Sequence, residues 1–199
     1  LSTGVFLDQG ENRALVRPLA PDARVLKLTA YTCPFPVAAA AGNAKSTVSV
    51  DVAARALASG RENLVANGLA DDAKHTFVAA DVFGWIEAAR KRGDRFDLVI
   101  LDPPSYSTTK DGSRFSSESD YRELAALALS VVAPGGRMLA CSNHRGIVRA
   151  RLRRYLQEAA TDARRTLLRI RDLPDPSDFP APPGRECHLK SLLVELSPA

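Results

Sequence analysis

Residues 96–106 read FDLVILDPPSY and decide the fold. Their first six positions are almost all apolar, which is typical of a strand buried on both faces of a parallel sheet. The strand ends at Asp102, and Pro103 and Pro104 then fix φ and remove two backbone donors, which leaves carbonyl acceptors free. With Tyr106 beside it, this rigid turn is predicted to hold a flat base, although a tight turn without a ligand would read the same way.

Short β-branched or aliphatic runs alternate with alanine-rich segments of helix length on both sides of this stretch, as in βαβ units. Strands are predicted at 24–28, 47–51, 75–79, 96–101, 137–141, 166–171 and 188–196, and helices at 35–41, 52–66, 85–92, 118–133 and 147–163. Residues 172–187 contain five prolines, which disfavour a helix, so the last two strands should pair antiparallel. The predicted fold is α/β, a doubly wound seven-stranded sheet with an antiparallel last strand and a ligand crevice at the carboxyl ends of the parallel strands.

Length and composition indicate one domain with a buried core, since the chain has 199 residues, of which 45% are hydrophobic and 25% charged. We assign residues 24–199 to the sheet domain and 1–23 to an N-terminal extension that could hold a strand and the short segment 11–19. No apolar run reaches the ~20 residues of a membrane span, and the first residues do not resemble a signal peptide, so a cytoplasmic protein is expected. Three scattered cysteines predict free thiols and no metal site.

Basic residues gather in one part of the sequence. Residues 145–171 contain nine arginines against Glu158 and Asp162, a formal charge of +7. A surface of this kind suits the phosphates of a nucleic acid. A solvated, arginine-rich helix face is the alternative.

Two further acids are expected at the carboxyl edge of the sheet. Asp51 ends the second predicted strand, where a carboxylate can accept hydrogen bonds from both hydroxyls of a ribose. Asp81 follows the third predicted strand, where it could accept from the amino group of an adenine. Either acid could instead cap the helix that follows it.

These residues, taken in order, resemble a known family. Asp-Pro-Pro-Ser-Tyr at the fourth strand, Asp51 and Asp81 are similar to the S-adenosylmethionine-dependent nucleic-acid methyltransferases of the Rossmann-like class I fold. More narrowly, the chain resembles the bacterial 23S ribosomal RNA large-subunit methyltransferases at 3–9 (TGVFLDQ), 61–63 (REN), 67–69 (NGL), 106–110 (YSTTK), 134–136 (PGG), 142–144 (SNH) and 188–190 (HLK). The resemblance covers nearly the whole chain and implies an RNA methyltransferase with S-adenosylmethionine as cofactor and S-adenosylhomocysteine as product.

The family has two chemical branches, and the residues after the fifth strand separate them. Methylation of cytosine C5 needs a thiolate that adds at C6, whereas guanine N7 already carries a lone pair and needs only alignment with the methyl group. The resemblance implies that the thiolate branch has a Cys where this chain has Asn143. Cys141 lies two residues earlier, inside the predicted strand, where packing is the expected role. The sequence is therefore more similar to the guanine-N7 branch, with the cytosine-C5 branch as the alternative.

The resemblance implies the following roles. The catalytic set that frames the base is Asp102, Pro103, Pro104, Tyr106 and Asn143, and the cofactor set is Thr29, Tyr31, Thr32, Asp51, Asp81, Val82 and Asp102. The loop at 27–35 departs from the family, because Cys33 and Pro34 stand where small residues are expected. This departure motivates a second hypothesis, a non-catalytic RNA-binding module derived from the same fold. An NAD-dependent oxidoreductase is disfavoured, since no GxGxxG follows the first strand. The target nucleotide and the oligomeric state stay open.

Overall fold

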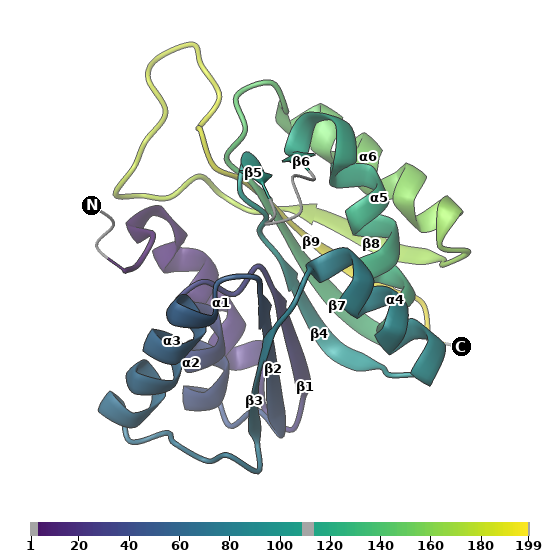
Figure 1. Ribbon diagram of the computed structural model, residues 1–199. Helices are drawn as coiled ribbons and strands as arrows, with labels where there is room; N and C mark the ends of the chain where they lie inside the picture. Colours follow the sequence, from purple (N-terminus) through teal and green to yellow (C-terminus); the bar gives the residue numbers. More distant parts are fainter. Residues whose placement is uncertain (1–3, 109–113, 199) are drawn as a thin grey trace.

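The computed structural model describes residues 4–108 and 114–198, and it places one twisted sheet between two layers of helices (Figure 1). The seven strands lie in the order β3-β2-β1-β4-β7-β9-β8. Their bounds are β1 (Arg24–Leu28), β2 (Ser46–Asp51), β3 (His75–Ala79), β4 (Phe96–Leu101), β7 (Val132–Ser142), β8 (Leu167–Asp172) and β9 (Lys190–Leu196). The first five are parallel, and β9 runs antiparallel to both β7 and β8. The predicted fold class is confirmed.

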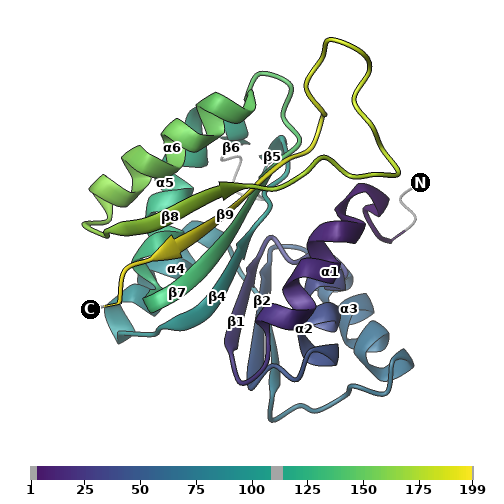
Figure 2. The same cartoon turned by 180° about the vertical axis from the view of Figure 1, so that it is seen from behind.

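Helices α1 (Gly10–Leu19), α2 (Pro34–Ala41) and α3 (Ala54–Ala66) cover one face of the sheet, and α4 (Val82–Arg92), α5 (Ser117–Ser130) and α6 (Arg149–Asp162) cover the other (Figures 1 and 2). A short antiparallel pair, β5 (Tyr106–Thr108) and β6 (Arg114–Ser116), was not predicted. The segment with five prolines between β8 and β9 contains no helix, as expected. No helix among the described residues is long and apolar enough to cross a bilayer.

Alternation along the central strands builds the two cores. Leu26, Val99 and Met138 face the layer of α4, α5 and α6, whereas Val25 and Leu98 face α1 and α2. Both sets are buried, which explains why β4 reads as a continuous apolar run rather than as an alternating one. Such a sheet holds the carboxyl ends of its strands rigidly, as a binding site requires.

The first described residues form helices. Leu7–Gln9 is a 3₁₀ turn (η1) that leads into α1, and Val16 on α1 is fully buried against the sheet. Asn12 donates from Nδ2 to the side chains of Gln9 (2.6 Å) and Ser191 (2.7 Å), which fixes α1 over the ends of the central strands. The strand considered for this region is not found in residues 4–19, whereas a division of the chain at residue 23 stays a prediction.

Candidate functional site

A pocket of about 210 Å³ opens at the carboxyl ends of β1, β2, β4 and β7. It brings together seven residues that the sequence predicted for the site and four from the chain termini that it did not. The lining consists of Phe6, Asp8, Gln9, Thr29, Tyr31, Asp51, Asp102, Pro103, Pro104, Asn143 and Leu189. The crevice therefore lies where the topology of the sheet placed it.

The loop after β1 forms one wall of the pocket and adopts an unusual backbone. Thr29, Tyr31 and Cys33 have φ values of +54°, +50° and +59°, in the left-handed region that favours glycine. Thr29 is held because its hydroxyl donates to the carbonyl of Asp102 at 2.8 Å. Asn63 holds the loop further along by donating from Nδ2 to the carbonyl of Thr32 at 2.9 Å. Contacts from β4 and α3 thus stabilise a conformation that the loop residues themselves disfavour.

The side chain of Asp51 anchors the same loop. Its Oδ2 accepts from the backbone N–H of Tyr31 at 2.8 Å, and its Oδ1 accepts from that of Ala53 at 2.9 Å. A carboxylate offers about four acceptor positions, so further capacity faces the pocket. Asp51 accordingly joins β2, the loop and the start of α3, and its predicted ribose contact stays a prediction.

The buried Lys27, for which the sequence predicted no role, lies beside the half-buried Asp102 of the pocket. Lys27 is 3% exposed and donates from Nζ to the carbonyls of Leu28 (2.6 Å) and Thr29 (3.0 Å). Gln9 donates from Nε2 to Oδ2 of Asp102 at 2.8 Å. Burial raises the pKa of Asp102, although the positive charge of Lys27 opposes this shift, and burial lowers the pKa of Lys27. A lysine in the middle of an apolar strand was the available sequence signal for this buried charge.

Paired side chains link the exits of β4 and β7. Ser105 donates from Oγ to Oδ1 of Asn143 at 2.8 Å, so the amide N–H groups of Asn143 stay available at the pocket. The hydroxyl of Tyr106 lies 2.8 Å from Nε2 of His144. Nδ1 of that imidazole accepts from the backbone N–H of Gly146 at 3.0 Å, so in the neutral ring Nε2 carries the proton and donates to Tyr106. The hydroxyl proton of Tyr106, which is 67% exposed, is then free to donate elsewhere.

Four of the predicted site residues do not line this pocket. Asp81 caps α4, since its Oδ2 accepts from the N–H of Gly84 at 2.8 Å, and Val82 is buried in the core. Thr32 is buried and donates its hydroxyl to the carbonyl of Gly4, and Tyr106 lies outside the lining. Their predicted contacts with adenine, cofactor and base stay predictions. Thr3, Thr109 and Lys110 of the family-like segments lie outside the described residues.

All three cysteines of the chain are free, as the sequence predicted, and the structure buries all three. Cys141 is fully buried in β7, its Sγ lies 3.7 Å from Nδ2 of Asn12, and burial raises its pKa well above that of an ordinary thiol. Cys33 packs against α3, because a Cβ added to Gly60 would lie 2.5 Å from its Sγ. No thiol therefore lines the pocket. Among the described residues, no group of three or more His, Cys, Asp or Glu side chains could hold a metal ion.

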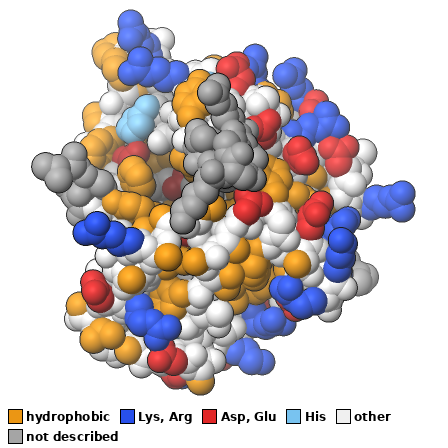
Figure 3. Space-filling model, viewed as in Figure 1, with side chains coloured by type: hydrophobic (Ala, Val, Ile, Leu, Met, Phe, Trp, Pro, Cys, Tyr) orange, Lys and Arg blue, Asp and Glu red, His pale blue; other side chains and the backbone are white. Residues whose placement is uncertain are grey.

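The arginines of α6 are engaged by the chain itself. Each of the four pairs with a carboxylate: Arg149 with Asp175 (2.6 Å), Arg151 with Glu118 (3.1 Å), Arg153 with Asp172 (2.9 Å) and Arg154 with Glu158 (3.8 Å). Blue and red side chains accordingly lie intermixed over the right of the molecule in Figure 3, where Figure 1 shows α4, α5 and α6. The +7 of the sequence stretch therefore does not become a uniformly basic surface.

The sequence of the chain is similar to those of known methyltransferases. Residues 1–195 match the family model described as S-adenosylmethionine-dependent methyltransferase. The chain is 35% identical over 196 residues to the ribosomal RNA large subunit methyltransferase I of Aeromonas hydrophila, covering 96% of this chain and 48% of that protein. It is 34% identical over 178 residues to the protein of the same name from Erwinia tasmaniensis, covering 89% of this chain and 44% of that protein. The chain thus spans about half the length of the curated relatives it matches.

Solved structures agree with the sequence comparison. The crystal structure of SMU.776 complexed with SAH superposes with a TM-score of 0.87 at 33% identity, covering 98% of this chain and 51% of that one. The S-adenosylmethionine-dependent methyltransferase from Agrobacterium tumefaciens superposes with a TM-score of 0.76 at 21% identity, covering 98% of this chain and 64% of that one, and supports the fold alone.

Proposed function

The chain belongs to the family of S-adenosylmethionine-dependent methyltransferases, and from this premise we propose that it methylates a base of large-subunit ribosomal RNA. The observation that carries the proposal is the pocket at the strand ends, which unites Asp51, Thr29 and Tyr31 with the Asp-Pro-Pro turn. We also propose that it acts in the cytoplasm, where bacterial ribosomal RNA lies.

The residues of the pocket fit S-adenosylmethionine. Asp51 keeps acceptor capacity for ribose hydroxyls, and the loop at 29–32 lies beside it, suited to the methionine end. Cys33 and Pro34, the departures from the family pattern, do not obstruct this pocket, because Cys33 points into the contact with α3 and Pro34 begins α2. When bound, the cofactor supplies an electrophilic methyl group on a sulfonium.

We propose guanine N7 as the methylated position. Thiolate addition is required for cytosine C5, and the three thiols are all buried, with Asn143 at the pocket instead. Guanine N7 loses no proton on methylation, so the protein needs no base and has only to align the ring. The chemistry of the pocket favours the branch that depends on alignment.

Asn143 and Tyr106 would align the base. Guanine presents the acceptor O6 beside N7, and because the N7 lone pair forms the bond to the methyl group, the aligning donors have to bond O6 and leave N7 free. The amide N–H of Asn143 and the hydroxyl of Tyr106 are donors left free by their partners Ser105 and His144. Pro103 and Pro104 supply a rigid wall with few backbone donors of its own. His144 acts as a positioning residue, because it sets the direction of the Tyr106 hydroxyl.

The test is methylation of RNA by the whole chain. Unmodified 23S ribosomal RNA transcribed in vitro is incubated with S-adenosylmethionine, digested to nucleosides and analysed by mass spectrometry. We expect 7-methylguanosine, retained in Cys141→Ser and reduced in Asn143→Ala. A 5-methylcytidine product that depends on Cys141 would contradict the choice of base. Binding of RNA without any methylation would contradict the enzymatic function and support a non-catalytic RNA-binding module.

A further inference from the structure

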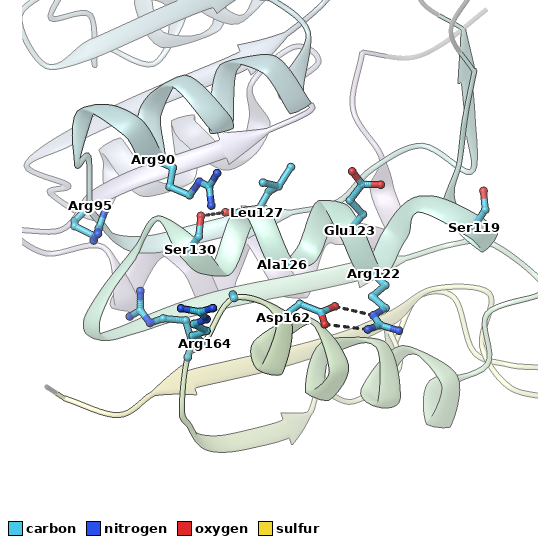
Figure 4. A pocket seen from close by; sticks show the side chains of 12 residues that line it. Arg90, Arg95, Ser119, Arg122, Glu123, Ala126, Leu127, Ser130, Asp162 and Arg164 are labelled. Carbon is cyan, nitrogen blue, oxygen red and sulfur yellow. Dashed lines mark hydrogen bonds and ion pairs between the residues drawn. The ribbon is translucent and has the colours of Figure 1, made fainter.

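A second hollow, far larger than the pocket, runs along α5 between α4 and α6 (Figure 4). Its volume is about 720 Å³. The charged side chains that line it are five arginines and two acids: Arg90, Arg95, Arg122, Arg164, Arg165, Glu123 and Asp162. We call this hollow the arginine groove. It overlaps the basic stretch 145–171 at Arg164 and Arg165 and adds three arginines from outside that stretch, Arg90, Arg95 and Arg122.

Some of these charges already have partners. Asp162 accepts two hydrogen bonds from Arg122, at 2.8 and 3.0 Å, and Glu158 adds a contact of 3.2 Å to the same guanidinium. Arg165 donates to the carbonyls of Leu129 (3.3 Å) and Val132 (2.7 Å) but keeps its charge. The groove therefore retains positive charge after its internal pairs are counted.

Arg90 and Arg164 are exposed, and within residues 4–108 and 114–198 their guanidinium groups have no hydrogen-bonding or ionic partner. Figure 4 shows Arg90 and Arg95 on one side of α5 and Arg164 on the other. Two free cations facing one groove from different elements can act together on an extended anion.

The backbone of Arg164 is an independent observation. α6 ends in a Schellman motif, in which the N–H of Arg164 donates to the carbonyl of Thr161 at 3.0 Å and that of Arg165 donates to Ala160 at 2.8 Å. Arg164 occupies the left-handed position of this motif, with φ at +53°, where glycine is preferred. Glycine at this position would suit the backbone better, so the fold does not require the arginine side chain there.

Two of the arginines that line the groove, Arg95 and Arg165, lie close enough to repel each other. The pKa of Arg165 is lowered, first by its burial and then by the positive charge of Arg95. An anion between them would relieve this repulsion.

We propose that the arginine groove binds the ribose-phosphate backbone of the RNA substrate. This inference rests on the proposed function, and it adds where the strand runs. The lining of the groove on α5 extends from Ser119 to Ser130, ~16 Å, which is roughly the length of four or five stacked nucleotides. The end of the groove at Ser119 is adjacent to the pocket. Ser117, the first residue of α5, donates from Oγ at 2.8 Å to the carbonyl of Pro104, which lines the pocket. One RNA strand can therefore present a base at the Asp-Pro-Pro turn and lay its phosphates along α5.

The experiment compares two double variants of equal charge change. Arg90→Glu with Arg164→Gly removes the two free cations, and Arg17→Glu with Lys45→Ala changes exposed cations outside the groove, on α1 and in the turn between α2 and β2. Arg17 and Arg90 both lie in the last turn of a helix, so the effect of the new glutamate on helix stability is matched. Affinity for 23S ribosomal RNA transcribed in vitro is measured at several salt concentrations, with calorimetry of S-adenosylmethionine binding beside it.

We expect the groove variant to bind RNA on the order of 10- to 100-fold more weakly at low salt and to lower the salt slope by about 2, with cofactor affinity unchanged. The matched control should bind RNA as the wild type does. Arg164→Gly alone should raise the thermal midpoint of unfolding while weakening RNA binding, which separates the effect from misfolding.

Three results would overturn the inference. Equal RNA affinity and salt slope in the groove variant and the wild type would show that the strand runs elsewhere, although methylation would continue. A loss of RNA affinity in the control as large as in the groove variant would show only a general charge effect. Absence of RNA binding by the wild type would overturn the proposed function together with this inference.

Discussion

The pocket at the strand ends is lined by three half-buried acids and lies beside the buried Lys27, whereas α6 carries four arginines that pair with carboxylates at the surface. At the pocket, Lys27 and Asp102 are held by fixed hydrogen bonds to backbone and to Gln9. On α6, Arg153 and Arg154 reach acids on β8 and on their own helix. Solvent screens the charges at the pocket little, so the loss of one of their partners is costly. Solvent screens the exposed ion pairs on α6 strongly, so each of those pairs contributes little to stability. The number of charges in a stretch of sequence is therefore a poor guide to where a ligand binds.

The largest effect is expected at the pocket. Asp51→Ala removes two hydrogen bonds to loop N–H groups and the predicted contacts with ribose. We expect S-adenosylmethionine affinity to fall by about 2 to 3 kcal/mol, at roughly 1.5 kcal/mol for each charge-assisted bond. Calorimetry measures it, with Asp71→Ala, which lies outside the pocket lining, as control. Equal affinities of the wild type and Asp51→Ala would remove the ribose assignment and weaken the contrast between the two regions.

The second effect concerns rate rather than cofactor affinity. Asn143→Ala should lower the rate of methyl transfer about tenfold, because one donor that aligns the base is lost. Cofactor affinity should change little. Single-turnover kinetics measures the rate, and Ser105→Ala, which removes only the partner of the Asn143 carbonyl, is the comparison variant. A normal rate in Asn143→Ala would assign the alignment of the base to other residues.

A pair of α6 variants tests the other half of the comparison. Arg149 is 22% exposed in its side chain and bonds Asp175 and the carbonyl of Leu173, so Arg149→Ala should lower the free energy of unfolding by about 1 to 1.5 kcal/mol. Arg154 is 63% exposed and, among the described residues, pairs only with Glu158, so Arg154→Ala should change the free energy of unfolding by less than about 0.5 kcal/mol. Urea unfolding measures both. Similar losses would mean that burial does not distinguish these arginines.

The smallest effect is expected for the pH dependence that Asp102 contributes. Burial raises its pKa in the folded state, so this group stabilises the fold below the unfolded pKa and loses that contribution as pH rises through the folded pKa. Asp102→Asn should therefore gain stability relative to the wild type as pH rises from 4. Lys27 offsets part of the burial and keeps the gain small. Unfolding in urea across a pH series measures the stability of both proteins. If Asp102→Asn instead lost stability relative to the wild type as pH rises, the pKa of Asp102 would be lowered in the folded state and the prediction would be wrong.

The local pattern of residues was enough to predict several strands of the sheet. The strands predicted at 24–28, 75–79 and 96–101 have these bounds in the structure, and 96–101 is the clearest case, because five of its six residues are apolar. The prediction began β7 at residue 137, but the strand starts at Val132 and includes Pro134 and Gly135, which locally argue for a turn. Similarly, α4 begins at Val82 because Asp81 caps it, which the pattern of apolar residues did not indicate.

The sequence by itself determined the seven strands of the main sheet, the positions of Asp51 and Asp102 at strand ends, and the absence of a thiol at position 143. Only the tertiary structure decided that Gln9 reaches Asp102, that Lys27 is buried beside the pocket, and that α6 pairs its arginines while Arg90 and Arg164 find no partner in residues 4–108 and 114–198. The physical reason is the distance along the chain over which each kind of interaction acts. Periodicity and turn chemistry act over a few residues, whereas the partner of a charged side chain lies on another element and is fixed only when the elements pack.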